Sequence, residues 1–477
     1  MKKDEERKIR RVEQLVIRKG SKYKKMYKFL DKLCFYSKNH YNMINYKMRK
    51  LFLENDCKAD EIPSFFDKQA EFCKLGDTQA LIGSRATQDI TKSCMETWKS
   101  FKKTTLEFEK DSEKYCKKRG IDKGLLEKTN ENGIPLCKPK MPKYLDKEKG
   151  RYIFTINGGC FKPLDDDMFV CSVKILNNLY ESITGEDKFC FISYRRRVEG
   201  DNAKLNQIRV VPKADAYVIE MIYEIKVDAD LEYESKYRTK EERNEQSKED
   251  IAERAIAVKL GVNDFITVVN NFGESPFIMD GDAFKPFIDT YLDKRAELTS
   301  IATTVNGVHT TRRLRRLSSK ITRQTKYISN MYSKFVVDWC KEHDVKEVIL
   351  SKTRGMKQGL HSRYAGLIPT AICESQLIYK LEEAGINVKD VSSASTKLTS
   401  FLDLEPVDKK HENKERVKDG IFTSTNGTKI NSSINTTYQI MRKRHENAFT
   451  ADSVKNAKIE PVIYTVENNN CLKIVVK

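Results

Sequence analysis

The sequence predicts a multidomain α+β protein made of a helical domain, a small β-barrel and a mixed α/β domain. Three observations support this prediction. The chain has 477 residues, and single hydrophobic cores seldom grow beyond about 250–300 residues. Apolar residues recur at helical spacing in the first quarter of the chain and then gather in short β-branched runs. The last half opens with three strand-like runs and continues with helices and strands, which indicates an α/β layer architecture.

Helical periodicity runs through residues 22–115. A second helix is expected over residues 80–108, where apolar residues about one turn apart include Trp98, an expected core residue. Residues 130–147 contain three prolines among lysines, which stop helices and indicate a linker.

The chain then changes to runs rich in β-branched and aromatic residues, which are typical of an all-β segment. We expect these runs to form a small barrel, with strands over residues 152–156, 168–175, 207–211 and 216–224. Residues 236–250 are almost wholly charged or polar, as in a solvated connection.

The remaining chain alternates between the two patterns. The expected strands cover residues 255–262, 265–269, 277–279, 347–350 and 386–391, and the expected helices cover residues 286–303, 310–342, 369–384 and 434–444. Three strands joined by tight turns, followed by helices and further strands, are in the order of an RNase H-like α/β domain.

Charge and cysteine usage indicate the partner and the compartment. Lys and Arg number 88 against 69 Asp and Glu, a net charge of +19, which favours nucleic acid through counterion release. A merely soluble basic surface is the alternative, and no basic amphipathic helix favours a membrane. The 12 cysteines form no CxxC pair, and the charged residues 1–11 precede no long apolar run. We therefore expect a cytoplasmic protein without disulfides, a zinc site or another cofactor.

Over nearly its whole length the sequence resembles the TnpB family, the RNA-guided nucleases of bacterial insertion sequences. Five separated motifs carry the resemblance in the family's order, in the branch without zinc cysteines: residues 208–220, 293–298, 355–358, 400–403 and 430–438. The resemblance implies a guide RNA (an omega-like RNA) and a double-stranded DNA target as partners.

The resemblance also implies an architecture. It has a first wedge strand segment at residues 1–21, a helical recognition domain at 22–145, a wedge β-barrel at 146–248 and a RuvC-like nuclease domain at 249–477, with a zinc-less target-nucleic-acid-binding insertion at about 392–430.

A RuvC-type site needs acidic side chains, because they hold the two divalent ions, about 4 Å apart, that cut the phosphodiester. By the resemblance, the first acid falls at Lys259, the second at Ser351 or Ser393, and the third at Ser433. An amine and hydroxyls therefore replace the acids. We expect a degenerate site that binds no metal and a protein that is not an enzyme.

Three other acids lie near these positions in the sequence. Asp264 is five residues past Lys259 and would lie about 16 Å along a strand, on its other face. Glu347 would lie about 13 Å from Ser351 along a strand. Glu446 would lie about 20 Å beyond Ser433 along a continued helix. None is expected to take over.

Candidate nucleic-acid contacts come from the resemblance and from basic clusters. Residues chemically able to read the short motif beside the target are Tyr41, Asn45, Arg85 and Gln88. Basic clusters suited to phosphates include Arg195, Arg196, Arg197, Arg312, Arg313, Arg315 and Arg316. For each of them, an ordinary helix-surface or solvated residue is the alternative.

These features predict an RNA-guided DNA-binding protein that lacks nuclease activity and represses transcription by blocking RNA polymerase. Three alternatives stay open: an active RNA-guided endonuclease with a non-standard site, a nuclease-dead type V CRISPR effector, and a binding protein that uses no guide.

Overall fold

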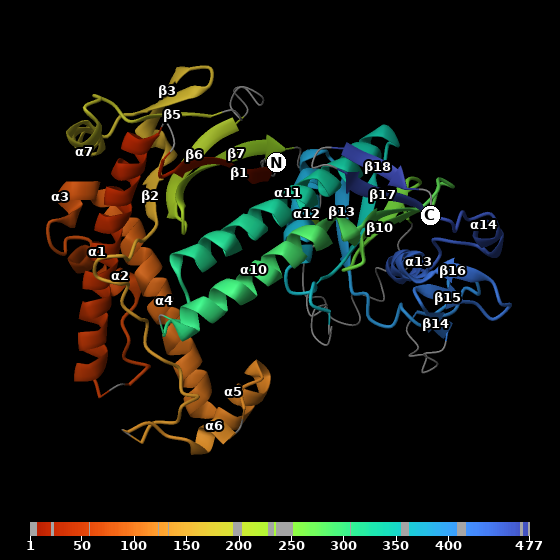
Figure 1. Cartoon of the computed structure of the whole chain (residues 1–477), viewed down its shortest axis with the longest axis horizontal. Helices are drawn as coiled ribbons and strands as arrows, with labels where there is room; N and C mark the ends of the chain where they lie inside the picture. Colours follow the sequence, from red (N-terminus) through yellow and green to blue (C-terminus); the bar gives the residue numbers. More distant parts are fainter. Residues whose placement is uncertain are drawn as a thin grey trace, which may run out of the picture. The chain divides into compact units, whose positions relative to one another are not determined.

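The computed structural model describes residues 7–20, 23–56, 58–122, 124–131, 133–193, 203–227, 233–234, 251–305, 307–353, 362–407, 416–467 and 471–475. The chain forms two compact units (Figure 1). We call Lys8–Lys226 the N-terminal unit, and Val227–Lys477 together with Met1–Arg7 the C-terminal unit.

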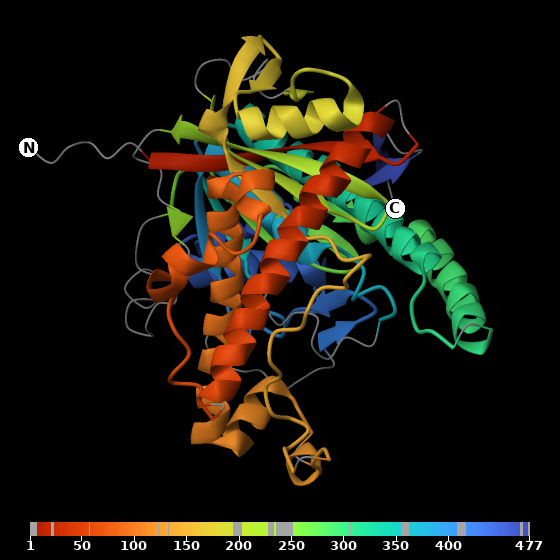
Figure 2. The ribbon, with the colours of Figure 1, turned by 90° about the vertical axis from the view of Figure 1, so that its left-hand side faces the viewer.

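Two long helices that pack side by side dominate the N-terminal unit (Figure 2). The helices of this unit are α1 (Lys24–Glu54), α2 (Phe65–Phe72), α3 (Thr78–Ile82), α4 (Ser84–Lys110), α5 (Ser112–Arg119), α6 (Gly124–Glu127) and α7 (Lys174–Thr184). The expected helix over residues 80–108 is broken at Gly83, whose φ of 88° suits glycine. Trp98 on α4 is fully buried, which confirms the prediction that it belongs to the core.

The strands of the N-terminal unit form two sheets. One has the order β1-β7-β6-β2, made of β1 (Arg7–Arg18), β7 (Ala216–Val227), β6 (Ala203–Pro212) and β2 (Phe154–Asn157). The other has the order β3-β4-β5, made of β3 (Phe161–Asp165), β4 (Met168–Cys171) and β5 (Cys190–Ile192). Among the described residues no ladder joins these sheets into the expected barrel.

The segment expected to be all-β also contains a helix. The expected strand over residues 168–175 ends at Cys171, and α7 begins at Lys174. Helices α1 to α4, helix α7 and both sheets share one hydrophobic core, which includes Phe29, Trp98 and Ile208, while α5 and α6 pack in a smaller separate cluster. The helical and β segments therefore fold together as one unit.

One eight-stranded sheet organises the C-terminal unit, in the order β18-β17-β11-β10-β9-β12-β13-β8. Its strands are β8 (Tyr233–Glu234), β9 (Ala255–Leu260), β10 (Asp264–Asn270), β11 (Phe277–Asp280), β12 (Glu347–Ser351), β13 (Asn387–Val391), β17 (Val462–Glu467) and β18 (Cys471–Val475). The five central strands run 3-2-1-4-5 in chain order, with β10 antiparallel to β9 and with β12 and β13 parallel to it. This is the predicted RNase H-like order, which the hairpin β17–β18 extends at one edge.

Helices cover both faces of this sheet. One face packs against α10 (Lys285–Thr304), α11 (Arg312–Glu342) and α12 (Thr370–Glu383), and the other packs against α13 (Ser432–Arg444). Beside α13 lie α14 (Ala451–Lys455) and a small sheet of β14 (Val417–Lys418), β15 (Ile421–Thr423) and β16 (Lys429–Asn431). No helix in the described ranges is long and apolar enough to cross a membrane.

We expect Trp98→Ala to lower the free energy of unfolding of the N-terminal unit by about 3–5 kcal/mol, because a large buried side chain leaves a cavity. Its indole N–H also donates to Asn45 Oδ1 at 3.0 Å. The exposed neighbour Lys99 is the control, and Lys99→Ala should change stability by less than about 0.5 kcal/mol. Urea unfolding followed by circular dichroism measures both. Equal effects would contradict the core position of Trp98.

Candidate functional site

The residues at two predicted acid positions lie side by side at one edge of the large sheet. Lys259 is near the carboxyl end of β9 and Ser351 ends the parallel strand β12, with Leu350 opposite Val258 in the register. Ala257 and Ile349 pack into the core beneath α13. Lys259 is two residues after Ala257, and Ser351 is two residues after Ile349. Because side chains alternate along a strand, Lys259 and Ser351 face the same side of the sheet as these two.

The start of α13 brings a third position to this edge. Asn431 caps the helix, its side-chain oxygen accepting from the backbone N–H of Ser433 at 2.8 Å and of Ile434 at 3.2 Å. This cap places Ser433 in the first turn, where its Oγ accepts a hydrogen bond from Lys259 Nζ at 3.2 Å. Ser351 Oγ accepts from the backbone N–H of Leu260 at 3.4 Å. We call Lys259, Ser351 and Ser433 the lysine–serine cluster.

Ser393, the other candidate for the second acid position, does not join the cluster. Ser393 lies two residues beyond the end of β13 and is exposed. Its described contact is local, because its backbone carbonyl accepts from Thr396 Oγ1 at 2.8 Å. Of the two candidates for the second acid position, only Ser351 is therefore placed at the site.

The position of Asp264 corrects the expectation that it lies far from Lys259. Residues 261–263 form a tight turn, so β10 runs back along β9 instead of extending it. A side chain at Gly261 would meet the carbonyl oxygen of Asp264 at 2.4 Å, so only glycine fits this approach. Burial lowers the pKa of Lys259, while the nearby negative charge of Asp264 acts to raise it.

The residues at this edge do not fit a pair of divalent cations. Such ions need several carboxylate oxygens, and the lysine–serine cluster offers one amine and two hydroxyls. When protonated, the amine has no lone pair for a metal and repels a divalent ion at a partly dry site. Within the described ranges, no three His, Cys, Asp or Glu residues gather closely enough to hold a metal ion.

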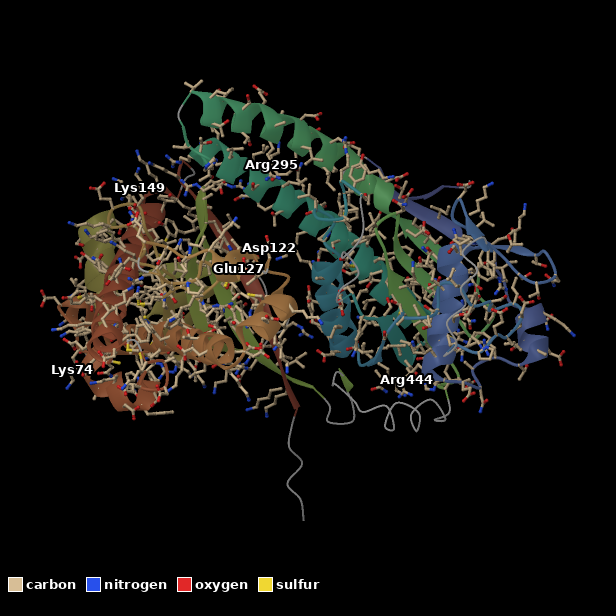
Figure 3. The ribbon with its side chains drawn as sticks, turned by 90° about the horizontal axis from the view of Figure 1, so that it is seen from below. Lys74, Asp122, Glu127, Lys149, Arg295 and Arg444 are labelled. Atoms are coloured by element: carbon tan, nitrogen blue, oxygen red, sulfur yellow. The ribbon has the colours of Figure 1, made fainter. Side chains whose placement is uncertain are left out.

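A buried ionic contact holds the far end of α13. Glu347 starts β12, and its Oε1 accepts from His445 Nε2 at 2.6 Å while its Oε2 lies 2.8 Å from Lys389 Nζ. Burial acts to raise the pKa of Glu347, but the two hydrogen bonds outweigh it and lower the pKa. Glu347 is thus engaged at the opposite end of the strand from Ser351. Arg444 ends α13 (Figure 3). Glu446 therefore lies beyond the helix, which differs from the expectation of a continued helix.

Tyr41 and Asn45 do not lie at the surface, which corrects their prediction as nucleic-acid contacts. Asn45 is fully buried, and besides accepting from Trp98 it donates to the carbonyl of Pro142 at 3.2 Å. Tyr41 is 6% exposed and packs against Tyr152, with ring centroids 4.5 Å apart. Both side chains serve packing within the N-terminal unit.

The other predicted contacts differ in accessibility. Arg85 is exposed and donates to Gln88 Oε1 at 3.2 Å. The first turns of α11 bury Leu314 and leave exposed the predicted basic cluster of Arg312, Arg313, Arg315 and Arg316. The predicted cluster at residues 195–197 and the motif at 355–358 lie outside the described residues.

Comparisons with known proteins found one matching family and several similar solved structures. Residues 230–357 match the family OrfB_IS605, described as "Probable transposase". No curated protein matches the chain. Among solved structures, the chain is similar to the cryo-EM structure of a Cas12f1–sgRNA–target DNA complex, at 15% identity over 90% of this chain and 98% of that chain, with a TM-score of 0.33. It is also similar to a CRISPR-Cas12f ternary complex, at 12% identity over 88% of this chain and 81% of that one, with a TM-score of 0.33.

The strand order and the helices on both faces define the C-terminal unit as an RNase H-like α/β domain. The family match spans β8 to β12, the strands that carry Lys259 and Ser351. The match to the OrfB_IS605 model covers 128 of the 477 residues, all within the C-terminal unit.

We expect Lys259→Met to change how the stability of the protein depends on pH. Burial lowers the pKa of Lys259 from its ordinary value of 10.5. Between the lowered pKa and 10.5, the unfolded chain therefore binds more protons than the folded chain, and stability rises with pH. The melting temperature of the wild type should thus rise relative to that of Lys259→Met as the pH increases through this window.

The control for this experiment is Lys418→Met, which replaces an exposed lysine of the same unit. Its pH profile should follow that of the wild type. Parallel profiles for the wild type and Lys259→Met would contradict a buried amine at the site.

Proposed function

We propose that this protein is an RNA-guided DNA-binding protein that holds its target beside a short adjacent motif and does not cut it. The observation that carries the proposal is the hydrogen bond from Lys259 to Ser433. These two side chains lie at the edge of the sheet where, by the family's pattern, acids would hold metal ions. The negative charge of nearby Asp264 favours the protonated form of Lys259, against the effect of burial.

A protein that opens DNA by guide pairing and stays bound is an obstacle to RNA polymerase. We therefore propose transcriptional repression as its role. Guide pairing would supply sequence specificity, and the protein would hold the nucleic acid through its backbone. The exposed arginines at the start of α11 suit phosphate contacts, while Arg85 and Gln88 remain candidates for the adjacent motif.

The first test is cleavage. The ribonucleoprotein, purified with its RNA, is incubated with a duplex that matches the RNA's variable end, in Mg²⁺ and separately in Mn²⁺. We expect full occupancy in a gel-shift assay and no cut product. Specific cleavage of the matched duplex would contradict the proposal and favour an active nuclease.

The second test rebuilds the acid positions. We expect the triple variant Lys259→Asp, Ser351→Glu and Ser433→Asp to be less stable than the wild type without metal, because the new carboxylates repel one another and Asp264. Mg²⁺ should raise its unfolding free energy by about 2.7 kcal/mol at 100 times the dissociation constant.

The melting temperature of the wild type should not respond specifically to Mg²⁺, and Lys259→Asp alone should be destabilised without rescue by Mg²⁺. If Mg²⁺ stabilised the wild type as much as the triple variant, the existing side chains would form a metal site. If the triple variant gained nothing, these three positions would not be the family's acid positions.

The third test concerns the guide. We expect target occupancy to require the co-purifying RNA and to be lost with a guide of scrambled variable end. A bound target downstream of a promoter should reduce full-length transcript in a purified transcription reaction. Occupancy that survives removal of the RNA would contradict guided binding and favour a binding protein that uses no guide.

A further inference from the structure

In the N-terminal unit, residues 142–147 form a strap along α1. Four side chains of α1, each about one turn from the next, bind its backbone. Lys38 donates to Lys147 O at 2.6 Å, Asn42 to Leu145 O at 2.8 Å, Asn45 to Pro142 O at 3.2 Å and Arg49 to the same oxygen at 2.8 Å. The strap runs antiparallel to the helix, beside it in Figure 2. It fixes Tyr144, whose ring lies 4.7 Å from the Arg49 guanidinium.

An open groove follows the neighbouring face of α1. Its first part has a volume of about 660 Å³ and is lined by Tyr36, Asn39, Met43, Tyr46, Lys47 and Leu81, with Lys147 on the strap. Its second part, of about 430 Å³, is lined by Tyr46, Lys50, Leu53 and Tyr144. Tyr46 belongs to both parts and is 57% exposed. We call this the α1 groove.

The α1 groove combines accessible rings with positive charge. Tyr144 is 45% exposed. Lys47 and Lys147 are exposed and form no ion pair with any residue that the structure describes. Two acids line the groove, Glu54 and Asp77. Glu54 Oε1 lies 3.5 Å from Lys50 Nζ, so the charge of Glu54 is balanced and Asp77 is the remaining negative charge. The surface is therefore complementary to a ligand that has flat apolar faces and a polyanionic backbone.

We propose that the α1 groove binds single-stranded nucleic acid, with a base stacked on Tyr46 and phosphates beside Lys47 and Lys147. Only an unpaired base can offer its face to a tyrosine ring, and such stacking tolerates any sequence. A duplex hides its base faces, and a protein partner would bury the unpaired lysines at a cost. This site needs neither guide pairing nor the lysine–serine cluster.

The test measures the affinity of the full chain, freed of co-purifying nucleic acid, for fluorescent oligonucleotides. Single-stranded RNA, single-stranded DNA and duplex DNA of one mixed sequence are compared by anisotropy. We expect Tyr46→Ala to weaken single-strand binding by about 5- to 150-fold. Tyr46→Phe should retain binding, and duplex binding should be unchanged. The single strand, RNA or DNA, that binds with the higher affinity identifies the natural ligand.

Matched variants outside the α1 groove provide the controls. Phe66→Ala removes another exposed aromatic ring and should have no effect. Lys47→Glu should weaken single-strand binding and lower its salt slope by about 0.7 per lost phosphate contact, whereas Lys99→Glu on α4 should do neither. Melting temperatures establish that each variant is folded.

Three outcomes would overturn this inference. The first is equal single-strand affinity for Tyr46→Ala and Phe66→Ala, and the second is a loss of duplex binding in Tyr46→Ala as large as its loss of single-strand binding. The third is a change from dimer to monomer in Tyr46→Ala, measured by light scattering, which would make the groove an interface between copies. Loss of guide-directed occupancy together with normal Tyr46-dependent binding would contradict the proposed function alone.

Discussion

The C-terminal unit depends on how α13 is fixed across the sheet. At its start Ser433 accepts from Lys259, and just beyond its end His445 meets Glu347. Between them the ring of Tyr438 stacks on Phe401, with centroids 4.1 Å apart, in a core that also includes Ile434 and Ile349. Because the two polar contacts lie on different strands, they fix the helix along its length as well as across the sheet. The lysine–serine cluster is therefore part of the helix's support.

The N-terminal unit uses polar side chains in a similar way. Asn42, Asn45 and Arg49 are residue types that commonly bind nucleic acid, yet here they hold the backbone of residues 142–147. Each carbonyl so bound would otherwise need a water partner. The consequence is a rigid border to the α1 groove, whose remaining face carries the accessible tyrosines and lysines.

Local patterns predicted much of the fold, because they are properties of short segments. Short β-branched runs bounded by turns placed β9 to β13, and helical spacing placed Trp98 in the core. The failures concern contacts that depend on how the chain folds back on itself, over short or long separations in sequence. Asn45 is a plausible surface residue until the strap, almost 100 residues later, covers it. Asp264 seemed remote only because the turn after Gly261 was treated as continued strand. The hairpin β17–β18 and α7 gave weaker local patterns than their neighbours. The Lys259 contact with Ser433 was not foreseen as a bond, although both positions were singled out.

The tight turn at Gly261 constrains which residues position 259 can hold. It brings Asp264 near position 259, where the negative charge of Asp264 favours the protonated form of Lys259 against the effect of burial and would repel a carboxylate. A single substitution from lysine to aspartate would set two acids together before any other ligand had appeared. A metal-binding site at this edge would need several changes together, each unfavourable alone, so the turn favours the lysine.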